Sequence, residues 1–209
     1  MPVVRFLGGA CVEIIGEEEH LIFDPNYEKA PRKGIGRIFL THEHSDHVDA
    51  EKMEKIKQEY LRQDKQYQIY GPKSTEKTIE STPNIVKGGM RININNGKVE
   101  IYEIDCWKAE DCLGYLITID GKTILHTADS ANYSQELMDL NEQVDICFTA
   151  CFEDFFEDYL KFVKKIKPNL TIPYHFNSGD EEMAKELVKF YKENGVKAKY
   201  YEIGSEFEL

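Results

Sequence analysis

Residues 41–49 read THEHSDHVD, and this stretch decides how the chain is interpreted. It places three imidazoles and the Asp46 carboxylate within six residues, a density that ordinary packing does not require. The apolar run at 36–41 predicts a strand before the cluster, and apolar positions at helical spacing over 48–61 predict a helix after it. Asp49 is the expected N-cap of that helix. The cluster therefore occupies a strand-to-helix turn, where a tight loop can direct several side chains to one point.

The residue types in this turn are those that bind divalent metal ions. Neutral imidazole nitrogens and ionised carboxylates are ligands for Zn²⁺, Mn²⁺ and Fe²⁺. The alternative is a solvated polar loop that is rich in histidine by chance, because short motifs produce false matches. We favour the metal site.

Length and composition predict one domain over residues 1–209. The chain has 209 residues, of which 41% are hydrophobic, and no apolar run approaches the roughly 18 residues of a membrane span. A net charge of −12 counts against nucleic acid, because phosphate binding favours a cationic surface. We expect a small-molecule substrate and neither a nucleic-acid nor a membrane partner. The group Phe152, Phe155 and Phe156 is either a homo-oligomer contact or part of the core.

The cysteine content indicates the redox compartment. Five cysteines are an odd number, and residues 1–5 lack the charged and apolar regions of a signal peptide. We therefore expect reduced thiols and a cytoplasmic location.

Hydrophobic periodicity predicts two strand-rich halves, each ending in helix–strand units. This pattern favours two packed sheets with helices outside. Asn95-Asn96-Gly97 and Asp120-Gly121 are predicted hairpin turns. His20 closes a charged turn and is expected at the surface. The predicted strands are 3–7, 11–15, 21–23, 67–70, 91–94, 98–104, 114–119, 123–126, 144–149, 170–174 and 198–203, and the further helices are 74–79, 156–166 and one that begins at Asp180.

Two more residues of ligand type follow predicted strands. Asp129 comes after the strand 123–126, and His175 comes directly after the strand 170–174. Alone, Asp129 would be interpreted as a helix cap or turn residue, and His175 as a hydrogen-bonded histidine at the edge of the core. The histidine cluster shifts the interpretation of both toward metal ligands, because a metal ion needs about four ligands.

These segments together resemble the metallo-β-lactamase superfamily, and more narrowly its small metal-dependent hydrolases similar to L-ascorbate-6-phosphate lactonase. The resemblance implies an α/β (α+β) fold, a four-layer αββα sandwich with the metal site along one edge. The matching segments are Ile-Phe-Asp-Pro at 22–25, His-x-His-x-Asp-His at 42–47, Gly-Tyr-Leu-Ile at 114–117 with Ala-Asp-Ser at 128–130, and Pro-Tyr-His at 173–175.

The same resemblance implies roles for the individual residues. His42 and His44 would belong to a first metal site, and Asp129 would bridge it to a second. A water or hydroxide held between Zn, Mn or Fe ions would be the nucleophile, and Asp46 could take its proton. Asp24 would fix an imidazole by accepting its other N–H, or would be a turn residue before Pro25. The second site would be formed by Asp46, His47 and His175.

The sequence also departs from the family pattern. It has no histidine between His47 and His126, so the first site lacks its usual third imidazole. Asp105 or Cys106 could substitute, since carboxylate and thiolate both bind Zn²⁺. Cys112 is expected in the core, and Trp107 is expected either to fill the vacant ligand space or to pack in the core. His126 is a poor replacement, because an odd separation along a strand points it away from Asp129.

A further departure is Gly-Gly-Ala at 8–10, where relatives often carry a histidine, and it weakens the transfer of the ascorbate-phosphate substrate. We therefore predict a metal-dependent hydrolase of a small ester, lactone or phosphoester. The alternative is a degenerate family member with one metal ion and no hydrolase activity. An RNA-processing nuclease is a third hypothesis, which the acidic composition disfavours.

Overall fold

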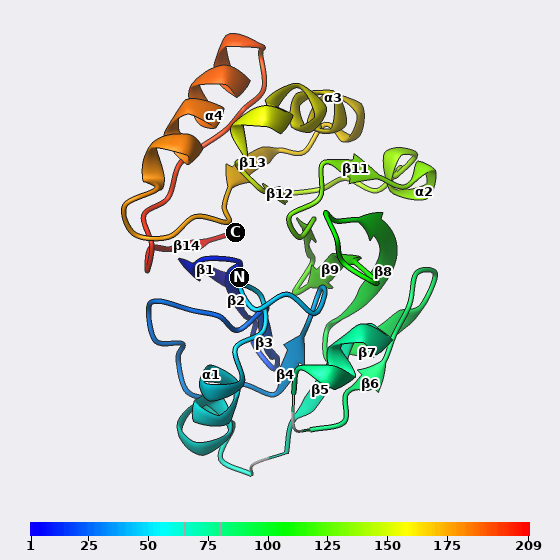
Figure 1. Ribbon diagram of the computed structural model, residues 1–209, viewed down its shortest axis with the longest axis vertical. Coiled ribbons are helices and arrows are strands. Elements are labelled where there is room, and N and C mark those ends of the chain that lie inside the picture. Colours follow the sequence, from blue (N-terminus) through cyan, green and yellow to red (C-terminus); the bar gives the residue numbers. More distant parts are fainter. Residues whose placement is uncertain (65, 80) are drawn as a thin grey trace.

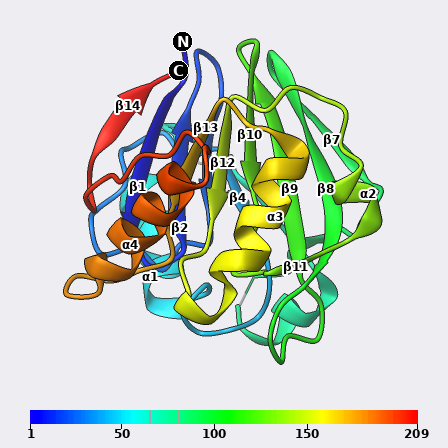
Figure 2. The ribbon, with the colours of Figure 1, turned by 90° about the horizontal axis from the view of Figure 1, so that it is seen from above.

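Two β-sheets pack face to face, and helices cover their outer faces, in a computed structural model that describes residues 1–64, 66–79 and 81–209 (Figure 1). The first sheet has the strand order β14-β1-β2-β3-β4-β5-β6, and the second has the order β11-β8-β9-β10-β12-β13 with β7 paired to β8. Helix α1 lies outside the first sheet, and α3 and α4 lie outside the second (Figures 1 and 2). The predicted four-layer αββα sandwich is confirmed.

The elements have the following bounds. The first sheet contains β1 (Val3–Gly8), β2 (Cys11–Ile15), β3 (His20–Phe23), β4 (Arg37–Phe39), β5 (Gln68–Gly71), β6 (Asn84–Ile85) and β14 (Glu206–Glu208). The second contains β7 (Arg91–Ile94), β8 (Gly97–Asp105), β9 (Leu113–Ile119), β10 (Lys122–His126), β11 (Asn132–Tyr133), β12 (Ile146–Thr149) and β13 (Leu170–Pro173). The helices are α1 (Ala50–Lys55) continued by the π-helical η1 (Ile56–Tyr60), the short turns η2 (Lys73–Lys77) and η3 (Glu153–Phe155), α2 (Gln135–Met138), α3 (Phe156–Ile166) and α4 (Glu181–Glu193). Among the described helices, none is both long and apolar enough to cross a bilayer.

Aromatic side chains from both sheets hold the sandwich together. Phe23 stacks on Phe39 with ring centroids 5.0 Å apart, and both contact Tyr115 of the opposite sheet, at 5.6 and 5.4 Å. The three rings are fully buried, so each removes a large apolar area from water. The Tyr115 hydroxyl donates a hydrogen bond of 2.6 Å to the Leu40 carbonyl, which fixes the sheets in register at the end of β4.

Turn chemistry sets the two predicted hairpins. Ile94 pairs with Gly97 and Ile119 pairs with Lys122, so each connection has two residues. Asp120 and Gly121 both have positive φ, 48° and 75°, as the tight turn between twisted strands requires. The predicted N-cap is also confirmed, because the Asp49 carboxylate accepts a hydrogen bond of 2.9 Å from the Lys52 amide.

The predicted strand at 198–203 is wrong. This segment touches β13 through a single bridge between Thr171 and Ala198. The chain then leaves the second sheet, and β14 pairs with β1 at the edge of the first sheet. The segment between Ala198 and Glu206 therefore crosses from the edge of the second sheet to the edge of the first.

A buried ionic cluster lies across β1, β2 and β3. The Glu13 side chain is fully buried on β2, where it pairs with Arg5 and accepts a hydrogen bond of 2.7 Å from the Arg32 amide. His20 Nε2 lies 2.7 Å from the same carboxylate, at Glu13 Oε1. His20 is only 8% exposed. The predicted surface position of His20 is wrong, because the chain enters β3 at this residue.

Candidate metal centre

The predicted ligands lie where parallel strands end. Strands β3, β4 and β5 run parallel in one sheet, and β10, β12 and β13 run parallel in the other. Asp24 follows β3, His42 follows β4, Asp129 follows β10 and His175 follows β13. Because the carboxyl ends of parallel strands share one sheet edge, residues from distant parts of the sequence meet there.

A first donor group forms around His42. His42 Nε2 lies 3.8 Å from Asp129 Oδ1, and both atoms are buried without a hydrogen-bond partner among the described residues. Buried polar atoms are rarely left unpaired, so this pair fits a cation bound between them. One ligand atom from each member lies within 4.8 Å of all the others, and the members are His42, Cys106, Cys112 and Asp129.

A second donor group contains Asp46, His47 and His175. The Nε2 atoms of His47 and His175 are 3.0 Å apart, and His175 Nε2 lies 3.6 Å from Asp46 Oδ2. Asp129 Oδ2 lies 3.8 Å from His47 Nε2, while its other oxygen faces the first group. The Asp129 carboxylate is therefore placed between the two donor groups.

Hydrogen bonds orient both buried imidazoles. Asp24 Oδ2 lies 2.8 Å from His47 Nδ1 and accepts a bond of 2.7 Å from the Thr41 hydroxyl. The Thr41 oxygen in turn lies 3.0 Å from His42 Nδ1, which we assign as the donor. Both Nδ1 atoms then carry protons, and both Nε2 atoms, each 3.8 Å from an Asp129 oxygen, keep a lone pair for a metal ion. The sequence analysis missed Thr41, whose only signal is its position at the end of a strand directly before His42.

Burial keeps the imidazoles neutral. It lowers the pKa of His42 to about 2, with the nearby His47 as a further cause, and it lowers the pKa of His47 well below its usual value. Burial also raises the pKa of Asp24 to about 6, against the hydrogen bonds that favour its charged form. Neutral imidazole is the form that binds metal ions, so the histidines are ready to bind near neutral pH.

Removal of the Thr41 hydroxyl should weaken metal binding. Thr41→Val keeps the shape of the side chain but leaves His42 Nδ1 without its acceptor, so the imidazole is no longer held in one tautomer. Loss of such an outer partner typically costs about 10- to 100-fold in metal affinity. Competition with a chelating dye measures the change, and Thr41→Ser should retain wild-type affinity. Equal affinity of Thr41→Val and wild type would refute the assigned role.

Acid should destabilise the metal-free protein. Burial lowers the pKa values of His42, His47 and His126, so below pH 6.5 the unfolded chain binds protons that the folded chain rejects. The pKa values of Asp24 and Asp129 are raised, which acts in the opposite direction, but two carboxyls oppose three imidazoles. The free energy of unfolding should fall by about 1.4 kcal/mol per pH unit for each net proton between pH 6.5 and 4.

Urea unfolding at several pH values in a chelator checks this slope. His126→Phe removes one excluded imidazole and should flatten the slope by about one proton. An increase in stability on acidification would show that the carboxyls dominate.

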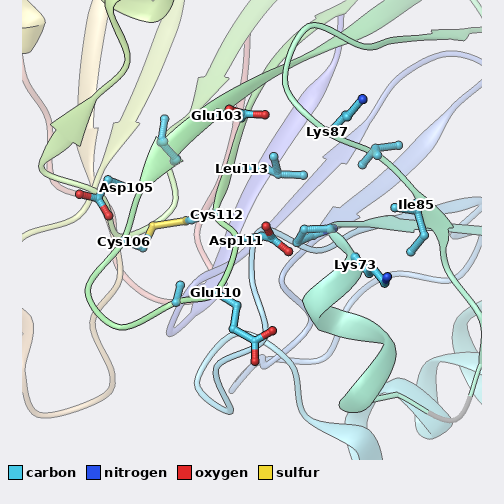
Figure 3. Close-up of a pocket in the computed structure, with 14 residues that line it drawn as sticks. Lys73, Ile85, Lys87, Glu103, Asp105, Cys106, Glu110, Asp111, Cys112 and Leu113 are labelled. Carbon is cyan, nitrogen blue, oxygen red and sulfur yellow. A yellow bond between two sulfur atoms is a disulfide. The ribbon is translucent and has the colours of Figure 1, made fainter.

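The structure changes the predictions for the residues around the missing imidazole. Asp105 is exposed and accepts a hydrogen bond of 2.9 Å from Asn132, so it belongs to neither donor group. Cys106 and Cys112 form a disulfide, which overturns the expectation of reduced thiols at these positions and removes Cys106 as a thiolate ligand in this state (Figure 3). Trp107 is 76% exposed, so it neither fills the ligand space nor packs in the core.

Two other histidines lie near the centre. The His44 ring contacts His42 with centroids 4.5 Å apart, but His44 is in neither donor group of the described residues. The role of His44 in the first site stays a prediction. His126 packs in the core, with its ring centroid 5.0 Å from that of Tyr174, and it also lies outside both groups.

Comparison with known proteins adds the family. The model of the beta-lactamase superfamily domain matches residues 3–175. The chain is 28% identical over 247 residues to a UPF0173 metal-dependent hydrolase of Pyrococcus abyssi, covering 100% of both chains. It is 27% identical to a UPF0173 metal-dependent hydrolase of Thermococcus onnurineus, covering 90% of this chain and 92% of that one.

Solved structures show the same fold. The metallo-beta-lactamase fold protein YhfI from Bacillus subtilis superposes with a TM-score of 0.77 at 15% identity, covering 100% of both chains. With the family match over most of its length, the chain belongs to the beta-lactamase superfamily and has the metallo-β-lactamase fold.

Proposed function

We propose that this chain is a metal-dependent hydrolase that acts on a small ester, lactone or phosphoester. The observation that carries the proposal is the position of the Asp129 carboxylate, 3.8 Å from His42 Nε2 on one side and 3.8 Å from His47 Nε2 on the other. A carboxylate between two donor groups is the arrangement that pairs of hydrolytic metal ions use. The names of the Pyrococcus and Thermococcus relatives support the reaction class. The substrate classes are those that the sequence motifs predict, and they stay a prediction.

The residues fit one or two divalent ions, Zn²⁺ or alternatively Mn²⁺ or Fe²⁺. His42 and Asp129 would hold the ion of the first group, and Asp46, His47 and His175 would hold that of the second. Mixed imidazole and carboxylate donors accept each of these metals. When bound, such ions lower the pKa of water, orient it and stabilise negative charge on the substrate.

The side chains of the chain itself provide orientation and proton transfer. Asp46 is the most exposed member of the second group, with 58% of its side chain accessible, and its Oδ2 faces His175. This carboxylate would accept the proton of the attacking water. Asp24 is fully buried and would hold His47 in place through the bond to Nδ1.

A pocket of about 440 Å³ borders the first donor group, because Cys106 and Cys112 line both (Figure 3). Lys73 and Lys87 lie on its wall together with the carboxylates of Glu103, Asp105, Glu110 and Asp111. The size suits a small molecule. The mixed charge is compatible with each of the three substrate classes.

One observation favours a second candidate, a metal-binding protein with a single ion and no hydrolase activity. In the first donor group both cysteines are in a disulfide and carry no thiolate, so His42 and Asp129 are its remaining ligands. Two ligands are fewer than the four that Zn²⁺ usually takes, so this group would bind its ion weakly.

Metal stoichiometry and a substrate panel separate the two candidates. The protein is stripped with a chelator, reloaded with Zn²⁺ or Mn²⁺, and tested on an aryl ester, a lactone, and phosphate mono- and diesters. Metal-dependent hydrolysis of at least one class supports the proposal. One tight equivalent with no hydrolysis of any class would favour the single-ion binding protein.

The location and the partners stay predictions. We propose a cytoplasmic enzyme with a small-molecule substrate, a single domain over residues 1–209, and no nucleic-acid or membrane partner. Phe155 is 42% exposed and supports a contact between copies of the chain. Sedimentation would measure the oligomeric state.

A further inference from the structure

We propose that reduction of the Cys106–Cys112 disulfide creates a thiolate metal site, in which both sulfurs join His42 and Asp129 around one Zn²⁺ ion. The cysteine pair would then replace the imidazole that the sequence lacks. This inference deepens the proposed function, since it concerns the first donor group of the same centre.

The sulfur atoms already lie at the centre. One ligand atom from each of the two cysteines, His42 and Asp129 lies within 4.8 Å of the others. Cys112 Sγ is 3.7 Å from His42 Nδ1, and the two cysteines are 4% and 6% exposed. Their Cα atoms are 5.9 Å apart, so both side chains can reach one ion through Zn–S bonds of about 2.3 Å. A Cys₂-His-Asp set supplies the four ligands of a tetrahedral zinc site.

The remaining two donors are unpaired. His42 is fully buried and its Nε2 has no hydrogen-bond partner among the described residues, and the same holds for Asp129 Oδ1, 3.8 Å away. One ligand atom of His42 and one of Asp129 lie within 4.8 Å of both sulfurs. Disulfide sulfurs carry no negative charge, whereas thiolates are strong zinc ligands. Reduction therefore changes the number of ligands without requiring a new residue.

Three hydrogen bonds hold the backbone around the cysteines in addition to the disulfide. The Ile104 amide donates to the Cys112 carbonyl at 3.1 Å, and the Leu113 amide donates to the Thr41 carbonyl at 3.0 Å. The Glu110 amide donates to the Glu43 carboxylate at 2.7 Å, which ties the tip of the loop to the segment that carries the histidines. These bonds should keep both cysteines beside His42 after reduction.

The chemistry has two balanced steps. A dithiol reductant supplies two electrons and two protons, so the S–S bond breaks, two thiols form and the reductant becomes a cyclic disulfide. Zn²⁺ then displaces the two thiol protons, which leave to solvent as two Zn–S bonds form. The disulfide lines the pocket, through which a small dithiol can reach it (Figure 3).

Cobalt spectroscopy tests the proposal without an activity assay. The stripped full-length protein is prepared oxidised, and reduced with a dithiol that is then removed under argon. Each form is titrated with Co²⁺, whose thiolate complexes absorb in the near ultraviolet. The double variant Cys106→Ser with Cys112→Ser is compared with Cys147→Ala, which changes a buried free cysteine of β12.

We expect a sulfur-to-cobalt band and one additional equivalent of Co²⁺ only in reduced wild type and reduced Cys147→Ala. In the same forms, Zn²⁺ should protect Cys106 and Cys112 from alkylation, as seen by mass spectrometry. Co²⁺ binding without a sulfur band in the reduced wild type would overturn this inference and leave the proposed function standing. Failure of both redox forms to bind any Co²⁺ would overturn both. The oxidised wild type serves as a comparison that needs no substitution, so a misfolded double variant leaves the test intact.

Discussion

Replacing His47 with alanine should abolish hydrolysis and remove the metal ion of the second donor group. His47 Nε2 lies 3.0 Å from His175 Nε2 and 3.8 Å from Asp129 Oδ2, so it is the imidazole that joins this group to the shared carboxylate. Its loss also leaves Asp24 buried without the partner at 2.8 Å. Loss of a residue that only orients a ligand typically lowers metal affinity or activity by ~10- to 100-fold. Because His47 would contact the metal itself, we expect its loss to lower both by a larger factor.

The measurement combines elemental analysis with the rate on the substrate class that wild type hydrolyses best. His126→Phe is the matched control, because His126 is equally buried but lies outside both donor groups. It should retain metal and activity. Full activity of His47→Ala would exclude the proposed centre.

Replacing Glu13 with alanine should give the largest loss of stability outside the metal centre. The Glu13 carboxylate is fully buried and is the common partner of Arg5, His20 and the Arg32 amide. Its removal leaves the mostly buried Arg5 guanidinium with only the longer contact to Glu206, at 3.7 Å, and leaves His20 Nε2 without its partner. Breaking a buried ion pair from one side typically costs about 3–5 kcal/mol in the free energy of unfolding.

Urea or guanidinium unfolding measures this difference. Glu206→Ala is the matched control, because Glu206 contacts Arg32 at 2.6 Å in the same cluster but has 51% of its side chain exposed. An exposed pair of this kind contributes about 0–1 kcal/mol. Equal losses for the two variants would mean that burial does not decide the contribution of Glu13.

Much of the fold is predictable from the sequence, because its strands have strong local signals. The two-residue turns at 95–96 and 120–121 specify hairpin pairings that need no long-range information. The end of the chain is different. Residues 198–203 have strand-like composition but form only one bridge to β13, while residues 206–208 pair with β1, so the place of the last strand depends on which sheet edge is free. That property belongs to the assembled sheets.

The candidate centre shows the same division. The histidine cluster is a local motif, so its position follows from the sequence, and Asp129 and His175 follow because they end strands. Thr41 takes part because its hydroxyl donates a hydrogen bond to Asp24. That contact exists only once the two strands are packed, so the sequence does not predict it. Asp24 and His175 also have positive φ, 44° and 65°, a conformation that non-glycine residues adopt when the surrounding structure enforces it.

The disulfide could have been anticipated. Cys106 and Cys112 flank the connection between two predicted strands, 98–104 and 114–119, that pair in the structure. A hairpin between these strands brings the two cysteines near each other across the connection, with their Cα atoms 5.9 Å apart. The odd cysteine count predicts reduced thiols instead, because a count carries no information on which cysteines the strand pairing brings together. The remaining cysteines are free, in agreement with the predicted reduced thiols, and all three are buried: Cys11, Cys147 and Cys151.

The assembly of donors at the ends of separate strands has a thermodynamic consequence. His47 and His175 are 128 residues apart in the sequence, so the unfolded chain does not hold them together. An ion that binds only the folded chain raises the free energy of unfolding by RT ln(1 + [M]/Kd), about 4 kcal/mol at a free concentration of 1,000 Kd. The melting temperature then ranks Zn²⁺, Mn²⁺ and Fe²⁺ by affinity. A thermal-shift titration can thus select the metal before any substrate is known.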